Sequence, residues 1–259
     1  MIKFLSFLLI FISVSINSHS LQGDGKVVAN EKSSPAINEK ALIINTFLIP
    51  LMVESKTKGI FIDLTRELAK RAGINIDINI LPAKRAINDF NLGNADALFP
   101  ALNAFFPDKK SFLPTEEIIY IKRDIAFTLK GQELIETIAQ LEGKKIGITR
   151  GYAYADEVIN NPNIDFFMTN SDEYSAKMLK AGHIDAFIAE EISGLTALKR
   201  MKLKNEIQYS SKRPISESDV FYATQATEQG RYLAELLSQQ LRLMKEDGSF
   251  NRIMSQAHD

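Results

Sequence analysis

One short pattern occurs twice in the chain, in "NLGNADALFP" at 91–100 and in "KAGHIDAFIA" at 180–189. Each copy has a glycine, two further residues, Asp-Ala and then an apolar run, and the two glycines lie 89 residues apart. A glycine after a helical pattern is typical of a helix C-terminal cap, and a short apolar run is typical of a buried strand. The repeat therefore predicts two related α/β units in tandem, each with a helix that leads into a central strand of a parallel sheet.

The aspartates of the repeat, Asp96 and Asp185, have two interpretations. An acidic residue in a tight turn between helix and strand accepts hydrogen bonds from nearby backbone N–H groups, which is a structural role. Contact with a ligand is the alternative. We favour the structural role and look for functional residues in the segments that follow each copy.

Strand and helix patterns alternate around both copies. The segment "INIDINIL" has an isoleucine at every second position, which is typical of a half-buried strand, whereas "DLTRELAKRAG" places its apolar residues on one helical face. "NIDI" at 75–78 recurs as "NIDF" at 163–166, at almost the same offset as the first repeat. The predicted strands are 41–45, 74–81, 95–102, 144–149, 163–168 and 184–190, and the predicted helices are 63–73, 84–93, 154–160 and 171–182.

The composition is that of a globular protein with no large charged partner. The chain has 259 residues, of which 45% are hydrophobic and 24% charged, enough for one large or two small cores. Its 31 basic and 32 acidic side chains leave a net charge of −1, too little to hold nucleic acid or an anionic membrane surface. Because the chain has no cysteine, it has neither a disulfide framework nor a thiol that could accept a lipid.

The first twenty residues, 1–20, have the pattern of a secretory signal peptide. Lys3 precedes an apolar run, and the small residues Ser18 and Ser20 stand where a signal peptidase requires them. A membrane anchor is the alternative, but the run is shorter than the roughly 18–20 apolar residues needed to cross a bilayer. We expect export to the periplasm with cleavage near Ser20, a flexible lead segment at 21–40 and no stable membrane insertion afterwards.

Several stretches carry a family resemblance. They are "GIFIDLTRELAKRAGINIDINILPAKRAINDFNLGNADALFPAL", "LEGKKIGITRGYAYADEV", "KAGHIDAFIAEE" and the closing "ISESDVFYATQ…LLSQQLRLMKEDGSFNRIM". Their order and spacing over about 41–259 resemble the bacterial extracellular solute-binding proteins of family 3, the polar amino acid type. The resemblance implies a two-lobed α/β fold, the type II periplasmic binding protein fold, in which each lobe is a mostly parallel sheet flanked by helices and the ligand cleft lies between the lobes.

The resemblance also implies how the chain is divided and what it does. The chain would cross between lobes near 120–124 and 216–219, so that lobe 1 comprises 41–122 plus 219–259 and lobe 2 comprises 123–218. Such a protein captures a small polar solute, an amino acid or a related compound, by closing its lobes. It acts as a monomer and delivers the ligand to an ABC permease of the inner membrane. Two alternatives stay open: a dehydratase resembling cyclohexadienyl dehydratase on the same scaffold, and a ligand-sensing partner of a membrane receptor.

The first lobe departs from the amino acid pattern. Amino-acid-binding members of the family place small hydroxyl side chains and an arginine, as S-x-T-x-x-R, after the first Gly-x-x-Asp-Ala. This chain reads "FPALNAFFPDKK" there, with Asn103 where a serine would fall, and has no arginine between Arg85 and Arg123. Lys109 and Lys110 lack the planar fork of an arginine and are expected in a solvated loop. The usual carboxylate clamp is therefore missing.

The candidate ligand-binding residues come from both lobes. In lobe 1 they are Asn103, Arg85 near the mouth of the cleft, and Phe47, which follows the first strand where the family commonly has an aromatic residue; core packing is the alternative for Phe47. In lobe 2 they are Arg150, Gly151 and Tyr152, in the turn after the strand at 144–149, and Glu190 at the end of the strand at 184–190. Arg150 is a candidate to replace the missing clamp, with a surface arginine that caps the strand end as the alternative, and Glu190 is a candidate to receive a ligand ammonium.

Catalytic and cofactor signals are weak. His19 lies in the predicted signal peptide, His183 in a turn and His258 beside the C-terminus, so the three histidines build neither a metal cluster nor a catalytic triad. The chain has no phosphate-binding glycine-rich motif. We therefore expect a binding protein with no catalytic residues, no metal and no cofactor.

Overall fold

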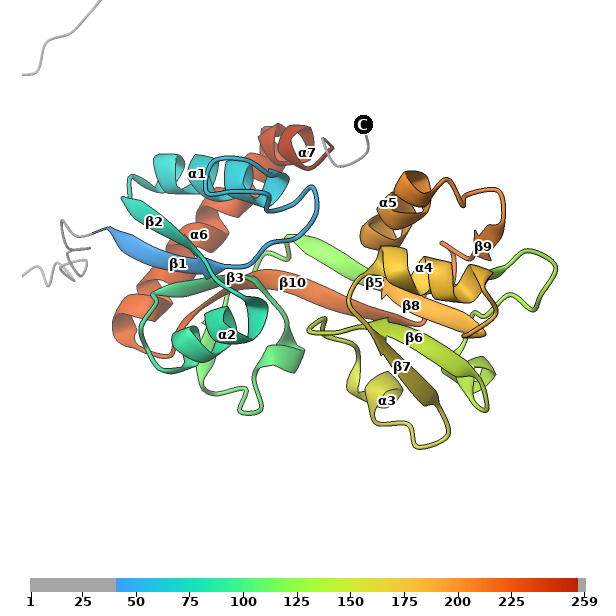
Figure 1. Ribbon diagram of the computed structural model, residues 1–259. Helices are drawn as coiled ribbons and strands as arrows, with labels where there is room; N and C mark the ends of the chain where they lie inside the picture. Colours follow the sequence, from blue (N-terminus) through green and yellow to red (C-terminus); the bar gives the residue numbers. More distant parts are fainter. Residues whose placement is uncertain (1–40, 256–259) are drawn as a thin grey trace, which may run out of the picture. The chain divides into compact units, whose positions relative to one another are not determined.

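The computed structural model describes residues 41–255, and these build one ten-stranded mixed sheet with helices on its faces (Figure 1). The strand order is β2-β1-β3-β10-β5-β8-β6-β7, with β4 added beside β10 and β9 beside β5. The predicted signal peptide (1–20) and the predicted lead segment (21–40) lie outside the described residues. Within 41–255, no helix is both long enough and apolar enough to span a bilayer.

The first predicted α/β unit is confirmed. Its parallel strands are β1 (Leu42–Thr46), β2 (Ile76–Ile80) and β3 (Ala97–Ala101), and its helices are α1 (Ile60–Ala72) and α2 (Ala83–Asn91). Helix α1 ends at Gly73, which has the left-handed conformation expected of a C-terminal cap (φ 66°). The helix begins at Ile60 rather than at Asp63, because the buried side chains of its first turn continue the apolar face of the helix.

The second predicted unit is confirmed as well. Its parallel strands are β6 (Lys145–Thr149), β7 (Asp165–Thr169) and β8 (Ala186–Glu190), and its helices are α3 (Asp156–Ile159) and α4 (Asp172–Lys180). The hydroxyl of Ser171 caps α4 by accepting a hydrogen bond from the backbone N–H of Tyr174 at 3.2 Å. Strand β7 is the last strand of its end of the sheet, and it leaves Phe167 and Met168 nearly half exposed.

Two long antiparallel strands join the units. They are β5 (Tyr120–Leu129) and β10 (Ser216–Gln225), and they pair so that Asp124 lies opposite Ser216 and Tyr120 opposite Val220. Beyond this shared stretch, β5 pairs with β8 of the second unit and β10 pairs with β3 of the first. The predicted crossings near 120–124 and 216–219 fall on these two strands, whose pairing into one continuous ribbon of sheet was not predicted.

The remaining elements cover the two ends of the sheet. Helix α1 lies on one face of β1–β3 with the C-terminal helices, and α2 covers the other face (Figure 1). In the second unit, α4 and α5 pack on one face of the sheet and α3 on the other. The elements whose bounds have not yet been given are the short strands β4 (Phe112–Pro114) and β9 (Ile207–Tyr209), the helices α5 (Glu191–Met201), α6 (Glu228–Glu246) and α7 (Ser249–Met254), and the short 3-10 helices at Asn103–Phe105 and Ile138–Leu141.

The repeated aspartates have the structural role that the sequence favoured. The Asp96 carboxylate accepts the backbone N–H of Ile43 at 2.7 Å, and the Asp96 N–H donates to the Ile43 carbonyl at 2.9 Å. Asp185 makes the same pair of bonds with Lys145, at 2.7 and 2.8 Å. The partner in each case lies at the start of the neighbouring parallel strand, so each aspartate begins the pairing of two strands. The bonds reach across the sheet and are not made within the turn, where the sequence predicted them.

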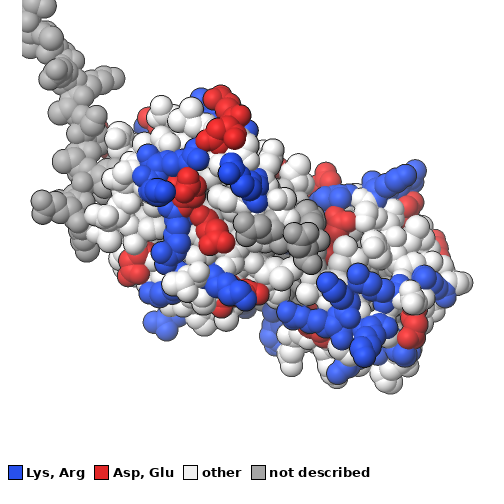
Figure 2. All heavy atoms as spheres, turned by 90° about the horizontal axis from the view of Figure 1, so that it is seen from above, with Lys and Arg blue, Asp and Glu red and all other residues white. Residues whose placement is uncertain are grey.

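Charged side chains are unevenly spread over the surface. On the face shown in Figure 2, Lys and Arg side chains gather on the right-hand side, while acidic and basic side chains are interspersed on the left. Several of them form exposed ion pairs, such as Lys180–Glu206 at 2.8 Å and Arg200–Glu173 at 3.2 Å. Exposed pairs of this kind contribute little to stability, so the fold depends on its apolar clusters.

Candidate functional site

A pocket of about 480 Å³ lies where the crossing strands join the two units. This volume is within the roughly 300–1,000 Å³ typical of sites for small organic molecules. Its lining comes from the segment after β1, the start of α1 and α2, the end of β3, both crossing strands, the turn after β6 and the start of α5. The lining residues are Phe47, Leu48, Ile49, Met52, Phe61, Pro82, Ala83, Lys84, Pro100, Leu102, Phe105, Tyr120, Lys122, Arg150, Gly151, Tyr152, Ala153, Glu190, Ser193 and Val220.

The first unit supplies an almost wholly apolar wall. The Phe47 and Phe105 rings meet edge to face with their centroids 6.2 Å apart, and Leu48 beside them is 65% exposed. Below them lie the buried side chains of Met52 and Phe61. Among the lining residues of this unit, only Lys84 carries a charge. This wall is suited to the apolar body of a ligand.

The turn after β6 supplies the polar wall opposite. The backbone N–H of Arg150 donates to the Thr169 carbonyl at 2.9 Å, which fixes the turn on strand β7. Gly151 follows with φ 85°, a conformation that favours glycine, and Tyr152 is 39% exposed. The side chain of Arg150 is exposed and makes no ion pair with any residue of 41–255.

Glu190 ends β8 and caps helix α5. Its carboxylate accepts three hydrogen bonds: from the Tyr120 hydroxyl at 2.6 Å, from the backbone N–H of Ile192 at 3.1 Å and from the backbone N–H of Ser193 at 2.9 Å. Burial raises the pKa of Glu190 above its ordinary value, and the hydrogen bonds partly offset this shift. Burial and the Glu190 carboxylate also raise the pKa of Tyr120, so its hydroxyl remains a donor. Glu190 thus ties α5 to the crossing strand β5.

A lysine held in an ion pair lies beside this carboxylate. Lys122 Nζ contacts the carboxylate of Asp124, a buried residue that also accepts the Ser216 hydroxyl at 3.0 Å. The same Nζ lies 5.7 Å from the centroid of the Tyr154 ring. These contacts join the two crossing strands at the base of the pocket and neutralise Lys122 locally.

A second buried carboxylate lies behind the polar wall. Asp172 is 3% exposed and accepts the hydroxyls of Thr149 and Ser193, each at 2.5 Å. Burial raises its pKa, and these two hydrogen bonds act in the opposite direction. Because Ser193 lines the pocket, Asp172 supports the wall through it without lining the pocket itself.

Five of the seven sequence-predicted site residues line this pocket together: Phe47, Arg150, Gly151, Tyr152 and Glu190. The other two do not. Arg85 is exposed on α2, next to Lys84, which does line the pocket, and Asn103 is exposed at the start of its 3-10 helix. The turn at Asn103 presents Phe105 to the pocket instead.

Tyr120, Lys122 and Val220 on the crossing strands also line the pocket and were not among the predicted site residues. A polar residue at every second position of "YIKRD" was the available signal, because it marks one face of a strand. Lys109 and Lys110 lie in an exposed turn, as expected, where the Asp108 carboxylate accepts the N–H of Lys110 at 2.9 Å.

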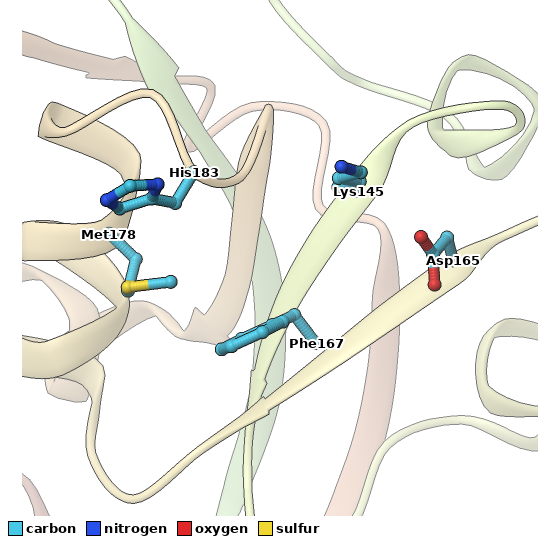
Figure 3. A pocket seen from close by; sticks show the side chains of 5 residues that line it. All are labelled: Lys145, Asp165, Phe167, Met178 and His183. Atoms are coloured by element: carbon cyan, nitrogen blue, oxygen red, sulfur yellow. The ribbon is translucent and has the colours of Figure 1, made fainter.

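A second pocket, of about 430 Å³, lies elsewhere in the second unit (Figure 3). Lys145 and Asp165, the first residues of β6 and β7, line it with Phe167, Met178 and His183. In Figure 3, His183 and Met178 lie together on one side and Asp165 on the other. Ligands of open α/β sheets bind beyond the carboxyl ends of the parallel strands, whereas this pocket is at the amino ends. The first pocket is therefore the candidate site.

Metal binding has no support in the described part of the chain. No group of three or more His, Cys, Asp or Glu side chains there could hold an ion. The buried carboxylates of Asp172 and Glu190 are each occupied by donors of the protein. What the pocket offers a ligand is an apolar wall, hydroxyl groups and cationic side chains.

Comparisons with known proteins agree with this geometry. No protein-family model matches the chain. A protein of Campylobacter jejuni described as a "Probable histidine-binding protein" is 28% identical over 147 residues, which cover 53% of this chain and 54% of that protein. The match therefore spans about half the length of this curated relative.

Solved structures match over most of the chain. The GluR0 ligand-binding core of Nostoc punctiforme in complex with L-glutamate has a TM-score of 0.69 at 19% identity, over 84% of this chain and 99% of that one. The substrate-binding protein of an amino acid ABC transporter has a TM-score of 0.64 at 18% identity, over 85% and 99%. The chain therefore has the two-lobed type II periplasmic binding protein fold, as its resemblance to the family 3 solute-binding proteins predicted.

Proposed function

We propose that this protein is a periplasmic solute-binding protein that captures an amino acid or a related small compound and presents it to an ABC-type importer of the inner membrane. The observation that carries the proposal is the pocket of 480 Å³, whose walls come from both units and whose base is made by the strands that join them. The description of the Campylobacter relative as a histidine-binding protein supports the same role.

In this proposal the two lobes are 41–122 plus 219–259 and 123–218, and the protein acts as a monomer. A ligand that contacts both walls binds best when the walls are close, so it shifts the protein toward a closed arrangement. Residues 1–20 direct export and are removed near Ser20. The residues assigned to ligand contact are Phe47, Arg150, Gly151, Tyr152 and Glu190, which line the pocket.

The two alternative functions gain less support. A dehydratase would need a carboxylic acid free to exchange a proton with its substrate, whereas Glu190 accepts three hydrogen bonds from the protein itself. The curated relative and the transporter neighbour are both described as binding proteins. We expect the purified protein to leave prephenate and arogenate unchanged. A sensing role would use the same closure and differ only in the membrane partner.

A thermal-shift screen of the chain from Leu21 tests the proposal. The screen covers amino acids, polyamines, small carboxylates and sugars. A ligand at about 100 times its Kd adds roughly 2.7 kcal/mol to the free energy of unfolding, which gives a readily measured rise in Tm. We expect at least one class of small solute to produce such a rise.

Matched variants locate the site. Arg150→Ala and Tyr152→Ala change exposed side chains of the pocket wall, while Lys109→Ala changes an exposed turn that does not line it. We expect the first two to reduce the ligand-dependent rise in Tm and the third to leave it intact. An unchanged rise in both pocket variants would show that the site is misassigned. The absence of a rise with every solute would overturn the proposed function.

A further inference from the structure

The chemical character of the pocket indicates which class of solute it takes, and this inference rests on the proposed function. We propose that the ligand is a carboxylate with an aromatic or branched apolar body and no α-ammonium group. Three features of the pocket carry the proposal: an apolar wall, two cations on opposite sides without an ion-pair partner in the described part of the chain, and carboxylates that already accept hydrogen bonds from the protein.

The apolar wall accounts for the body of the ligand. Phe47 and Phe105 meet edge to face and leave room between them and Tyr152 of the opposite wall, since all three line one cavity of 480 Å³. Leu48 lies at its edge and is 65% exposed, so its side chain is available for contact. A ring or a branched chain in this space would bury Leu48 and stack against the aromatic edges.

The cations account for a negatively charged head group. Arg150 from the second unit and Lys84 from the first both line the pocket, and neither forms an ion pair within residues 41–255. The third lining cation, Lys122, is neutralised by Asp124. A carboxylate between Arg150 and Lys84 would therefore meet two unneutralised positive charges, and an arginine can bind it with two parallel hydrogen bonds.

The carboxylates argue against an ammonium group. Glu190 Oε1 accepts the Tyr120 hydroxyl and the Ile192 N–H, and Oε2 accepts the Ser193 N–H. Asp172 is enclosed by the hydroxyls of Thr149 and Ser193. A ligand ammonium would find one acidic side chain among the lining residues, Glu190, which already accepts three hydrogen bonds from the protein, and it would also face the positive charges of Arg150 and Lys84. The head group that fits is a carboxylate alone.

Three probes with the same phenyl ring and two-carbon chain separate the head groups: 3-phenylpropionate, L-phenylalanine and 2-phenylethylamine. Isothermal titration of the chain from Leu21 measures each Kd at one pH and salt concentration. We expect 3-phenylpropionate to bind about tenfold or more tightly than L-phenylalanine, which corresponds to about 1.4 kcal/mol, and 2-phenylethylamine to bind least. Propionate, which keeps the head group without the ring, should bind more weakly than 3-phenylpropionate.

Variants test the two walls separately. Arg150→Gln should raise the Kd of 3-phenylpropionate by about tenfold or more, because it removes a charge-assisted contact. Phe105→Ala should raise the Kd of 3-phenylpropionate but leave that of propionate unchanged. Lys110→Gln, in the exposed turn outside the pocket, is the control and should change neither. Measuring the Tm of each unliganded variant first confirms that it is folded.

The outcomes separate this inference from the proposed function. If L-phenylalanine binds as tightly as 3-phenylpropionate, or if Arg150→Gln has no effect, the inference is overturned. If histidine, arginine or glutamate binds while 3-phenylpropionate does not, the inference is also overturned and the solute-binding function stands. If no carboxylate and no amino acid binds, the inference is overturned, and if no solute of the thermal-shift screen binds, the proposed function is overturned as well.

Discussion

Removing the Asp96 carboxylate tests the role of the repeated aspartates. In Asp96→Ala the backbone N–H of Ile43 loses its acceptor at 2.7 Å, in a partly buried position where water does not fully replace it. A hydrogen bond to a charged group contributes about 1.5–3 kcal/mol to stability. For a chain of 150–250 residues each kcal/mol corresponds to roughly 2–4 °C, so we expect the Tm to fall by about 3–12 °C.

Asp185→Ala is the matched comparison within the same chain. Its carboxylate accepts the N–H of Lys145 at the same 2.7 Å, but Lys145 is exposed, so water can take over the lost hydrogen bond. We therefore expect a fall in Tm smaller than that of Asp96→Ala. Asp96→Asn keeps an acceptor oxygen and should recover most of the stability that Asp96→Ala loses.

Thermal unfolding followed by circular dichroism measures these three variants, and titration with whichever solute the screen identifies measures their binding. Equal losses from Asp96→Ala and Asp185→Ala would refute the reasoning from burial. A variant with unchanged Tm and weakened ligand binding would support the alternative in which the aspartate contacts the ligand.

Three further predictions concern packing and buried polar groups. In Gly194→Ala the added methyl group would lie 2.5 Å from Cζ of Phe127, so we expect the free energy of unfolding to fall by about 1–3 kcal/mol. Urea unfolding measures this change, and an unchanged midpoint would contradict the close packing of Gly194 against Phe127. Tyr222→Phe removes a hydroxyl that lies 2.7 Å from the Thr65 hydroxyl, and Thr65 keeps its hydrogen bond to a backbone carbonyl. The free energy of unfolding should therefore fall by only about 1 kcal/mol, as measured by thermal unfolding. A fall as large as that of a core truncation would contradict this prediction. Burial raises the pKa of Asp172 above its ordinary 3.8, so this group stabilises the folded state at pH below 3.8 and loses that contribution as the pH rises through its folded-state pKa. The urea midpoint of Asp172→Asn should therefore rise relative to that of the parent chain between pH 4 and pH 7. A difference that stays constant over this range would refute the shift.

Periodicity and the glycine caps predicted most of the regular elements. The repeated Gly-x-x-Asp-Ala located the entry to β3 and β8, and the alternating isoleucines located β2, because local pattern and burial agree in these segments. The ribbon formed by β5 and β10 was not predicted. Its two strands are about 90 residues apart in sequence, and their pairing depends on the packing of both units, which no local pattern records.

Several of the predicted site residues that line the pocket lie at or just after a strand end. Arg150 and Glu190 directly follow or end a strand of the second unit, so the register of the strand determines where they lie. Asn103 was expected in the pocket by its place in a family pattern, but the 3-10 turn points Phe105 inward instead. Residues after an irregular turn cannot be placed by counting from the last strand.

The pairing of Asp124 with Ser216 has a consequence for protein engineering. The chain enters the second unit and leaves it at two positions that lie opposite each other in one ladder, so this unit is a single uninterrupted insertion with adjacent ends. A corresponding segment from a protein of the same fold could be exchanged at these two positions while the strand order of the first unit stays the same. Recombination at the ladder would then transfer the polar wall, with Arg150 and Glu190, as one module.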